Sequence, residues 1–264
     1  MVRVLLVEDH IAFDRQFNDI FGETGTVDKF ENYESLSESN MSGWDYAFVD
    51  FELGPGEDGT AATGFSVLEY LRAHSPQTKI IGFTALTENS RPLFAMAAHH
   101  WFGAWAVREK RGCTDEILIA IRDDGRNPTS ELIAKLLREE SWRIDQLFPE
   151  ANALALWRVW TEHRGAARVI ATAFGHFNKN QVEAFSANAY AAVLGIRDKV
   201  KVLYGQNRRP GAPTGGGRND NKGVTLSFVQ ENSEFFFAPD LQTTLTRVKP
   251  WDSPAPAPAG TGRS

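Results

Sequence analysis

The sequence predicts an α/β fold in which a doubly wound, five-stranded parallel sheet is followed by a mainly α-helical domain with a C-terminal β-hairpin. Three observations predict it. Short β-branched runs recur in the first half, segments with apolar residues at i, i+3 and i+4 separate them, and Ala-rich helical segments follow residue 150. With 264 residues, the chain is long enough for two modules that each bury a core.

Each expected strand of the first half is a short apolar run, and each is followed by an expected helix. The strands are Arg3–Val7, Thr26–Phe30, Tyr46–Val49, Lys79–Phe83 and Ala104–Arg108. The helices are Ile11–Phe21, Tyr33–Asn40, Gly64–His74, Arg91–His99 and Thr114–Asp124. Strands that alternate with helices in this way form parallel sheets with helices on both faces. We therefore expect one compact domain over residues 1–124.

The second half divides by composition. We expect a linker helix within 125–150, begun by Thr129 or Ser130 as a cap, and a three-helix domain over 151–206. A basic Gly/Pro/Arg loop and a β-hairpin are expected over 207–251, and the Pro/Ala/Gly-rich end, 252–264, is expected to be disordered. The hairpin strands are Val224–Val229 and Glu234–Phe237, anchored to the helical core by the phenylalanines of the second strand.

Charge and composition narrow the class of protein. The net charge is −6, but residues 1–125 carry 10 basic and 21 acidic side chains, whereas residues 126–264 carry 18 and 13. No apolar run approaches the roughly 18 residues that a membrane span needs, and Cys113 is the only cysteine. We expect a cytoplasmic protein that does not bind membranes, whose acidic half handles cations and whose basic half meets a polyanion.

Five polar residues follow the ends of the expected strands. Glu8 and Asp9 follow the first strand, Asp50 the third and Thr84 the fourth, and Lys110 lies just past the fifth. Open α/β sheets bind ligands at the carboxyl ends of their strands. These side chains are therefore expected to converge at one edge of the sheet.

Crowded carboxylates stay ionised together only when a cation compensates them, and a set of oxygen ligands without His or Cys favours a hard ion such as Mg²⁺. We expect Asp9 and Asp50 to bind the ion directly, with Glu8 beside them. Asp50 is also placed to attack phosphorus and form an aspartyl phosphate. Lys110 would then neutralise the phosphoryl oxygens, and Thr84 would donate a hydrogen bond.

With these five positions filled, residues 1–124 resemble a response-regulator receiver domain, which has the flavodoxin-like fold. The resemblance implies that a sensor histidine kinase phosphorylates Asp50, that the reaction depends on Mg²⁺, and that Glu52 supplies a backbone carbonyl ligand. The chain departs from the family at Val107, where an aromatic residue is usual, at Arg111, where Pro is usual, and in an insertion over Glu57–Thr63. These departures concern the coupling of phosphorylation to output.

The basic segment 151–206 has the layout of a helix-turn-helix. A helix after Gly165 is followed by a turn at Gly175 and a second helix from Asn178. The phrase Leu194–Lys199 resembles the end of LuxR-type helix-turn-helix domains. Polar residues leading the second helix are suited to base edges and basic residues to phosphates. The nucleic-acid-binding candidates are Arg168, Asn178, Lys179, Asn180, Gln181, Arg197, Lys199, Arg208 and Arg209.

Other interpretations of the second half stay open. A winged helix would pair Lys199–Tyr204 with Val224–Val229, and a three-helix dimerisation bundle would need no nucleic acid. Taken together, we expect a regulator rather than an enzyme, in which phosphorylation of Asp50 controls binding to duplex DNA as a homodimer. The alternatives are outputs that bind a protein partner, or RNA as an antiterminator, with switching that does not need phosphorylation.

Overall fold

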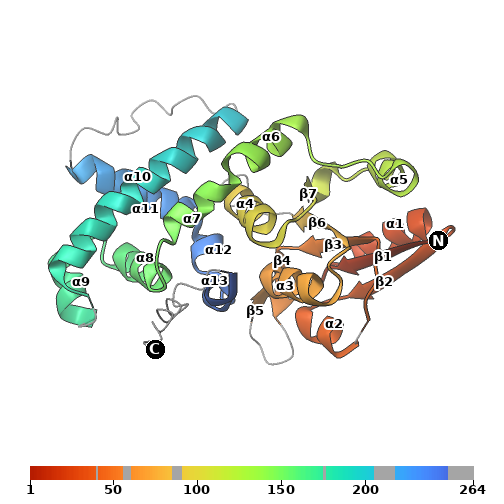
Figure 1. The fold of residues 1–264 in the computed structure, drawn as a ribbon, viewed down its shortest axis with the longest axis horizontal. Coiled ribbons are helices and arrows are strands. Elements are labelled where there is room, and N and C mark those ends of the chain that lie inside the picture. Colours follow the sequence, from red (N-terminus) through yellow and green to blue (C-terminus); the bar gives the residue numbers. More distant parts are fainter. Residues whose placement is uncertain (40, 56–60, 85–90, 175–176, 205–217, 249–264) are drawn as a thin grey trace, which may run out of the picture.

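The computed structural model describes residues 1–39, 41–55, 61–84, 91–174, 177–204 and 218–248. Residues 1–124, here the α/β part, contain a five-stranded parallel sheet in the order β2-β1-β3-β6-β7 (Figure 1). Its strands are β1 (Val2–Val7), β2 (Gly25–Phe30), β3 (Tyr46–Asp50), β6 (Lys79–Thr84) and β7 (Ala106–Glu109). The predicted doubly wound sheet is confirmed.

Helices cover both faces of this sheet. They are α1 (Ala12–Phe21), α2 (Tyr33–Ser39), α3 (Gly64–His74), α4 (Arg91–Phe102) and α5 (Asp115–Asp124). Because side chains alternate along a strand, Val4 and Leu6 pack with α1 and α5, while Leu5 and Val7 pack with α2, α3 and α4. The central strands β1, β3 and β6 are buried on both faces, as their continuous apolar runs predict, whereas the edge strand β2 is only partly buried.

The expected insertion after the third strand, Glu57–Thr63, ends in the second strand of a short ribbon that the sequence did not predict. Here β4 (Glu52–Pro55) pairs antiparallel with β5 (Ala61–Thr63). Residues 56–60, between the two strands of the ribbon, lie outside the described residues. The ribbon follows Asp50 directly, so it borders the carboxyl edge of the sheet.

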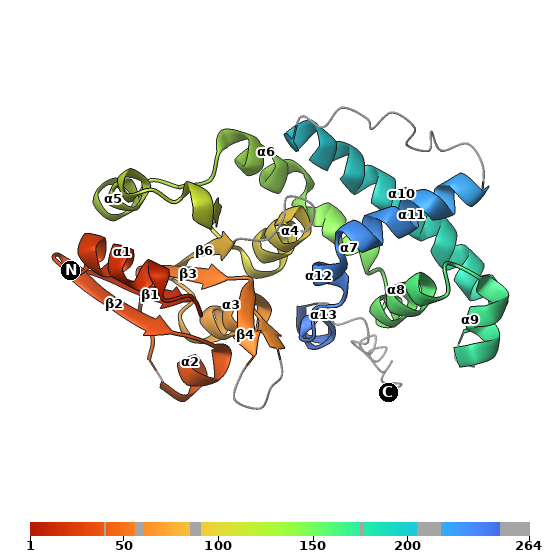
Figure 2. The ribbon, with the colours of Figure 1, turned by 180° about the vertical axis from the view of Figure 1, so that it is seen from behind.

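Residues 131–248, here the helical part, continue the chain at the other end of the molecule (Figures 1 and 2). The elements are α6 (Glu131–Glu140), the 3₁₀ turn η2 (Ser141–Arg143), α7 (Ile144–Leu147), α8 (Ala153–Glu162), α9 (Ala167–Phe174), α10 (Lys179–Tyr204), α11 (Arg218–Glu231), α12 (Ser233–Phe236) and α13 (Leu241–Val248). The single linker helix expected within 125–150 is thus α6, η2 and α7. Ser130 caps α6, accepting a hydrogen bond from the Ile133 amide at 3.4 Å.

The predicted C-terminal hairpin is wrong. Val224–Val229 lies within α11, and Glu234 to Phe236 lie in α12. Buried residues along α11 recur at Val224, Thr225, Phe228 and Val229, the spacing of one helix face against α10. The alternating apolar residues in this run fit a strand equally well, and packing on α10 decides for the helix. The winged-helix pairing is wrong for the same reason, since Lys199–Tyr204 is also helical.

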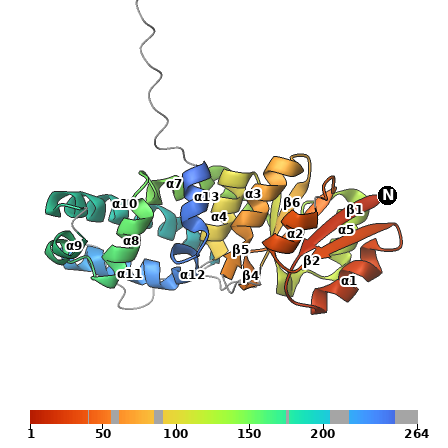
Figure 3. The same cartoon turned by 90° about the horizontal axis from the view of Figure 1, so that it is seen from below.

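The helices α12 and α13 lie between the α/β part and the rest of the helical part (Figures 2 and 3). Phe235 and Phe236 are fully buried there, which confirms them as core anchors, whereas Phe237 is 48% exposed. One hydrophobic core therefore runs from α3 and α4 through α12 to α8 and α10. Within the described residues, no helix has the length and apolar character needed to cross a membrane.

Candidate functional site

The five polar residues that follow the strands meet at the carboxyl edge of the sheet. Glu8 and Asp9 come directly after β1, Asp50 ends β3, Thr84 ends β6 and Lys110 follows β7. Glu8, Asp50 and Thr84 are buried, the Lys110 side chain is 10% exposed, and Asp9 is exposed. The Lys110 ammonium nitrogen lies 2.6 Å from Asp50 Oδ2 and 2.6 Å from Glu8 Oε2. One cation thus bridges two buried carboxylates.

The same cluster offers a set of ligands to a divalent cation. Carboxylate oxygens of Glu8, Asp9 and Asp50 lie within 4.8 Å of one another. Although Glu8 Oε2 is close to the Lys110 ammonium, it is buried and accepts no hydrogen bond of acceptable geometry. Three carboxylates with an unsatisfied buried oxygen and no nitrogen or sulfur ligand fit Mg²⁺. Glu52 adjoins them, donating its backbone amide to Asp50 Oδ1 at 3.2 Å.

Burial dominates the electrostatics of the pocket. Burial raises the pKa of Asp50 to about 7, Lys110 opposes the rise through its charge and hydrogen bond, and the negative charge of Glu8 adds to it. For Lys110, burial lowers the pKa, but Asp50 and Glu8 outweigh it and the net change is upward. When ionised, the buried carboxylates of Glu8 and Asp50 carry one more charge than the Lys110 ammonium neutralises. A bound cation would supply the missing positive charge.

A carboxylate on the short helix α12 contributes to the electrostatics beside this pocket. The pKa of Glu52 is raised first by burial and then by the negative charge of Glu234 on α12, with Asp9 contributing less. Residues 8–9, 50–52 and 234 therefore share one electrostatic neighbourhood, although they lie far apart in the sequence.

Phe51, the residue after Asp50, occupies a space that the sheet leaves open. Its ring lies against β6 at Gly82, where an added Cβ would be 2.5 Å from the Phe51 ring carbon Cζ. The ring stacks on Phe94 of α4, with centroids 5.5 Å apart and planes at 19°. Neither the Phe51 ring nor the Phe94 ring was predicted from the sequence as part of the site. The signal was available, since a glycine inside a strand marks close approach of another group.

In the helical part, α9 and α10 have the predicted order of a helix-turn-helix. Arg164 and Gly165 before α9 have φ of 48° and 65°, and a Cβ on Gly165 would lie 2.8 Å from the Trp160 ring. At the start of α10, the Asn178 amide donates to Gln181 Oε1 at 2.8 Å, and the Gln181 amide donates to Asn178 Oδ1 at 2.9 Å. This capping box engages both side chains. The predicted turn residue Gly175 lies outside the described residues.

The structure divides the predicted nucleic-acid-binding residues into separate groups. Arg168 on α9, and Asn178, Lys179, Asn180 and Gln181 at the start of α10, are exposed. Arg197 and Lys199 lie about 30 Å further along the same helix at 1.5 Å per residue. Arg208 and Arg209 lie outside the described residues.

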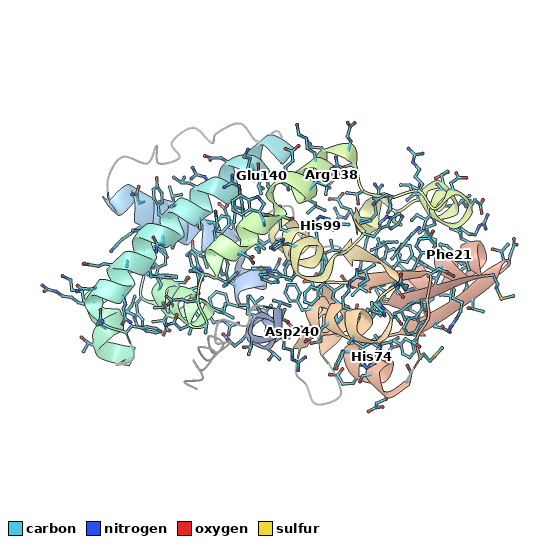
Figure 4. All side chains as sticks on the ribbon, in the orientation of Figure 1. Phe21, His74, His99, Arg138, Glu140 and Asp240 are labelled. Carbon is cyan, nitrogen blue, oxygen red and sulfur yellow. The ribbon has the colours of Figure 1, made fainter. Side chains whose placement is uncertain are left out.

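Acidic neighbours pair several of these cations. Lys199 Nζ lies 3.0 Å from Glu140 Oε1 on α6 (Glu140 is labelled in Figure 4). Lys179 Nζ lies 3.6 Å from Glu183 Oε1, and Arg197 Nη2 lies 3.4 Å from Asp198 Oδ1. These ion pairs reduce the positive charge that Lys179, Arg197 and Lys199 offer to a nucleic acid.

No family model and no curated protein matches the sequence. Similar solved structures include RcsB from Salmonella enterica serovar Typhimurium bound to promoter rprA, at 15% identity over 88% of this chain and 99% of RcsB, with a TM-score of 0.47. The response regulator DrrB of Thermotoga maritima is 17% identical over 48% of this chain and 55% of its own, with a TM-score of 0.38. A Burkholderia pseudomallei response regulator with a phosphorylated aspartic acid is 15% identical over 69% and 97%, with a TM-score of 0.39.

The strand order β2-β1-β3-β6-β7 numbers the five main strands 2-1-3-4-5, which is the flavodoxin-like order. The fold is flavodoxin-like. In this sheet, the position three residues before Lys110 is Val107, which is 2% exposed. Its amide donates to the Thr129 hydroxyl at 3.0 Å. Hence β7 has a small aliphatic side chain where response-regulator receiver domains usually have an aromatic ring.

Proposed function

We propose that this chain is a two-component response regulator, in which a sensor histidine kinase phosphorylates Asp50 and the phosphorylated state controls binding of the helical part to duplex DNA as a homodimer. The contact of the Lys110 ammonium with Asp50 and Glu8, both at 2.6 Å, carries the proposal. Asp50 is the nucleophile in this arrangement, and Lys110 is a fixed positive charge beside it. Both lie at the edge where parallel sheets bind ligands.

Phosphoryl transfer requires Asp50 in its ionised form. A carboxylate oxygen of Asp50 attacks the phosphorus of the kinase phosphohistidine, a P–O bond forms, and the P–N bond breaks with the electron pair leaving on the imidazole. The ammonium of Lys110 neutralises a phosphoryl oxygen as charge develops, and the Thr84 hydroxyl donates to another. Glu8, Asp9, Asp50 and the Glu52 carbonyl are the proposed Mg²⁺ ligands. When bound, Mg²⁺ supplies positive charge and lowers the pKa of Asp50.

Exposed residues of α9 and the start of α10 are the proposed DNA contacts. Arg168, Lys179 and Asn180 face solvent, and the two helices stand in the order that places a second helix in the major groove. The side chains of Asn178 and Gln181 form the capping box, so binding a base with either of them would break a capping hydrogen bond. We therefore assign base and phosphate contact first to Lys179 and Asn180.

Two measurements test the proposal. Intact-mass analysis with Mg²⁺ and a small phosphodonor is expected to give one phosphoryl adduct, which is absent with EDTA and in Asp50→Asn. An adduct of equal yield in Asp50→Asn contradicts the assignment of the phosphoacceptor.

Selection from pooled genomic duplex DNA is expected to recover a discrete motif. For that motif, Lys179→Ala is expected to reduce the slope of log affinity against log salt by about 1. Arg15→Ala, which removes a charge from the side chain of α1 that is 92% exposed, serves as the control and is expected to leave the slope unchanged. Recovery of no motif contradicts the DNA-binding output.

A protein-binding output is the second candidate, and the pairing of cations along α10 favours it. Lys179, Arg197 and Lys199 each have an acidic neighbour within 4 Å, which weakens the attraction for phosphates. Under this function the full chain would bind neither duplex DNA nor structured RNA across the salt series. Salt-dependent binding to RNA alone would instead favour an antiterminator.

A further inference from the structure

Buried aromatic rings form a continuous file, here the aromatic file, from the neighbour of Asp50 to the second helix of the helix-turn-helix. All of its members are at most 7% exposed. In order of contact they are Phe51, Phe94, Phe235, Phe236, Trp157 and Phe185. They come from the β3–β4 junction, α4, α12, α8 and α10, so the file crosses from one part of the molecule to the other.

The file begins within the receiver. Phe51 is bonded to Asp50 and is held under β6 at Gly82, and its ring stacks on Phe94. Phe94 lies in the first turn of α4, the helix that follows Thr84 in the chain. Of the two residues that would contact a phosphoryl group, Asp50 is thus bonded to the residue with the first ring, and Thr84 ends the strand that precedes the helix with the second.

The middle of the file is α12. The Phe235 ring meets Phe94 edge to face with centroids 5.1 Å apart. Polar contacts at the edge of this interface fasten α13 to α3: Ser66 Oγ donates to Asp240 Oδ2 at 3.2 Å, and Arg247 Nη1 lies 2.7 Å from Glu69 Oε2 (Asp240 is labelled in Figure 4). The short α12 is therefore held against the receiver.

The file ends on α10. The Phe236 ring lies 5.0 Å from Trp157, whose indole N–H donates to the Leu147 carbonyl at 2.6 Å. Trp157 in turn meets Phe185 edge to face at 5.1 Å and 76°. Phe185 lies six residues after Lys179 on the same helix. Any tilt of α12 that moves Phe236 must be accommodated at α10.

We propose that the aromatic file couples the Asp50 pocket to α10, with α12 as the element that responds to both. In β7, Val107 stands where receiver domains usually have an aromatic residue. The aromatic file would do the work of that missing residue. Close-packed rings cannot move singly without opening a void or a clash, so a change at Phe51 or α4 is passed on through Phe235. The inference rests on the proposed function, since it requires a pocket that changes state at Asp50.

Fluorine NMR of the full chain labelled with 5-fluorotryptophan tests this coupling. Mg²⁺ and beryllofluoride, a mimic of the phosphoryl group, fill the pocket, and the bound fluoride gives its own signal. A Trp157→Phe variant assigns the Trp157 resonance. We expect that resonance to shift in the wild type when bound fluoride appears. In Phe235→Leu we expect bound fluoride to persist while the Trp157 shift falls to less than half.

Phe21→Leu is the matched control, because Phe21 is equally buried but belongs to the separate core beneath α1 and α5, far from α12 (Figure 4). It is expected to keep the full shift. An equal loss in Phe21→Leu overturns the inference, as does bound fluoride with an unmoved Trp157 in the wild type. No bound fluoride in the wild type overturns the proposed function as well. Phe94→Leu breaks the file one ring earlier and is read in the same way if Phe235→Leu does not fold.

Discussion

Replacing Asp50 by Asn is expected to stabilise the folded protein at neutral and alkaline pH, and to lose that advantage in acid. Asn has nearly the shape of the protonated carboxyl group, but it does not titrate. The difference in unfolding free energy between Asp50→Asn and the wild type therefore isolates the ionisation of Asp50 from the other titrating groups.

The pKa of Asp50 gives the sign and size of this effect. Burial raises it from 3.8 to about 7 in the folded protein. Between these two values the folded state holds a proton that the unfolded state has lost, so the stability of the wild type falls as pH rises from about 4 to about 7. At about 1.4 kcal/mol per pKa unit, a rise of about three units amounts to about 4 kcal/mol.

Urea unfolding of both proteins in EDTA, across about pH 4 to 8, measures the difference. We expect it to grow by about 4 kcal/mol toward alkaline pH in favour of Asp50→Asn. Added Mg²⁺ is expected to shrink it, because the cation stabilises the ionised carboxylate only in the wild type. A difference that is flat over this range, or that grows toward acid, refutes the reasoning.

Three further changes test other parts of the structure. Lys110→Met leaves Glu8 and Asp50 buried without their cation, and we expect urea unfolding at alkaline pH to show a loss of about 3–5 kcal/mol. A loss that Mg²⁺ does not reduce would contradict that cause. Gly82→Ala brings a Cβ within 2.5 Å of the Phe51 ring and is expected to cost about 1–3 kcal/mol in the same assay, with Phe51→Leu in the same chain restoring part of it. Gln181→Ala removes one side of the capping box and is expected to cost about 1 kcal/mol in thermal unfolding, so an unchanged midpoint would speak against the cap.

The α/β part could be predicted from the sequence because its information is local. Each strand is a continuous apolar run and each helix has its own stripe, so every strand of the parallel sheet was found within two residues of its ends, whereas the β4–β5 ribbon was not found. The carboxyl-edge residues followed from topology alone, since parallel strands bring residues such as Asp50 and Thr84 to one edge wherever they stand in the chain.

The prediction of a hairpin strand over Val224–Val229 failed because both the two-residue period of a strand and the 3.6-residue period of a helix fit the same apolar residues. Val224, Leu226 and Phe228 alternate as in a strand, whereas Val224, Phe228 and Asn232 recur as on a helix. The burial of Phe228 and Val229 against α10 selects the second pattern, and no local signal could have done so.

By itself the sequence determined the parallel sheet and the cluster of charges at its edge, because these follow from the hydrophobic pattern and from the geometry of parallel strands. Only the tertiary structure decided that the chain returns after α11 to seat Phe235 beside Phe94. The two residues lie 141 positions apart, and their contact depends on the packing of every helix between them. The packing energy of this contact arises only in the assembled core, so no single segment of the sequence predicts it.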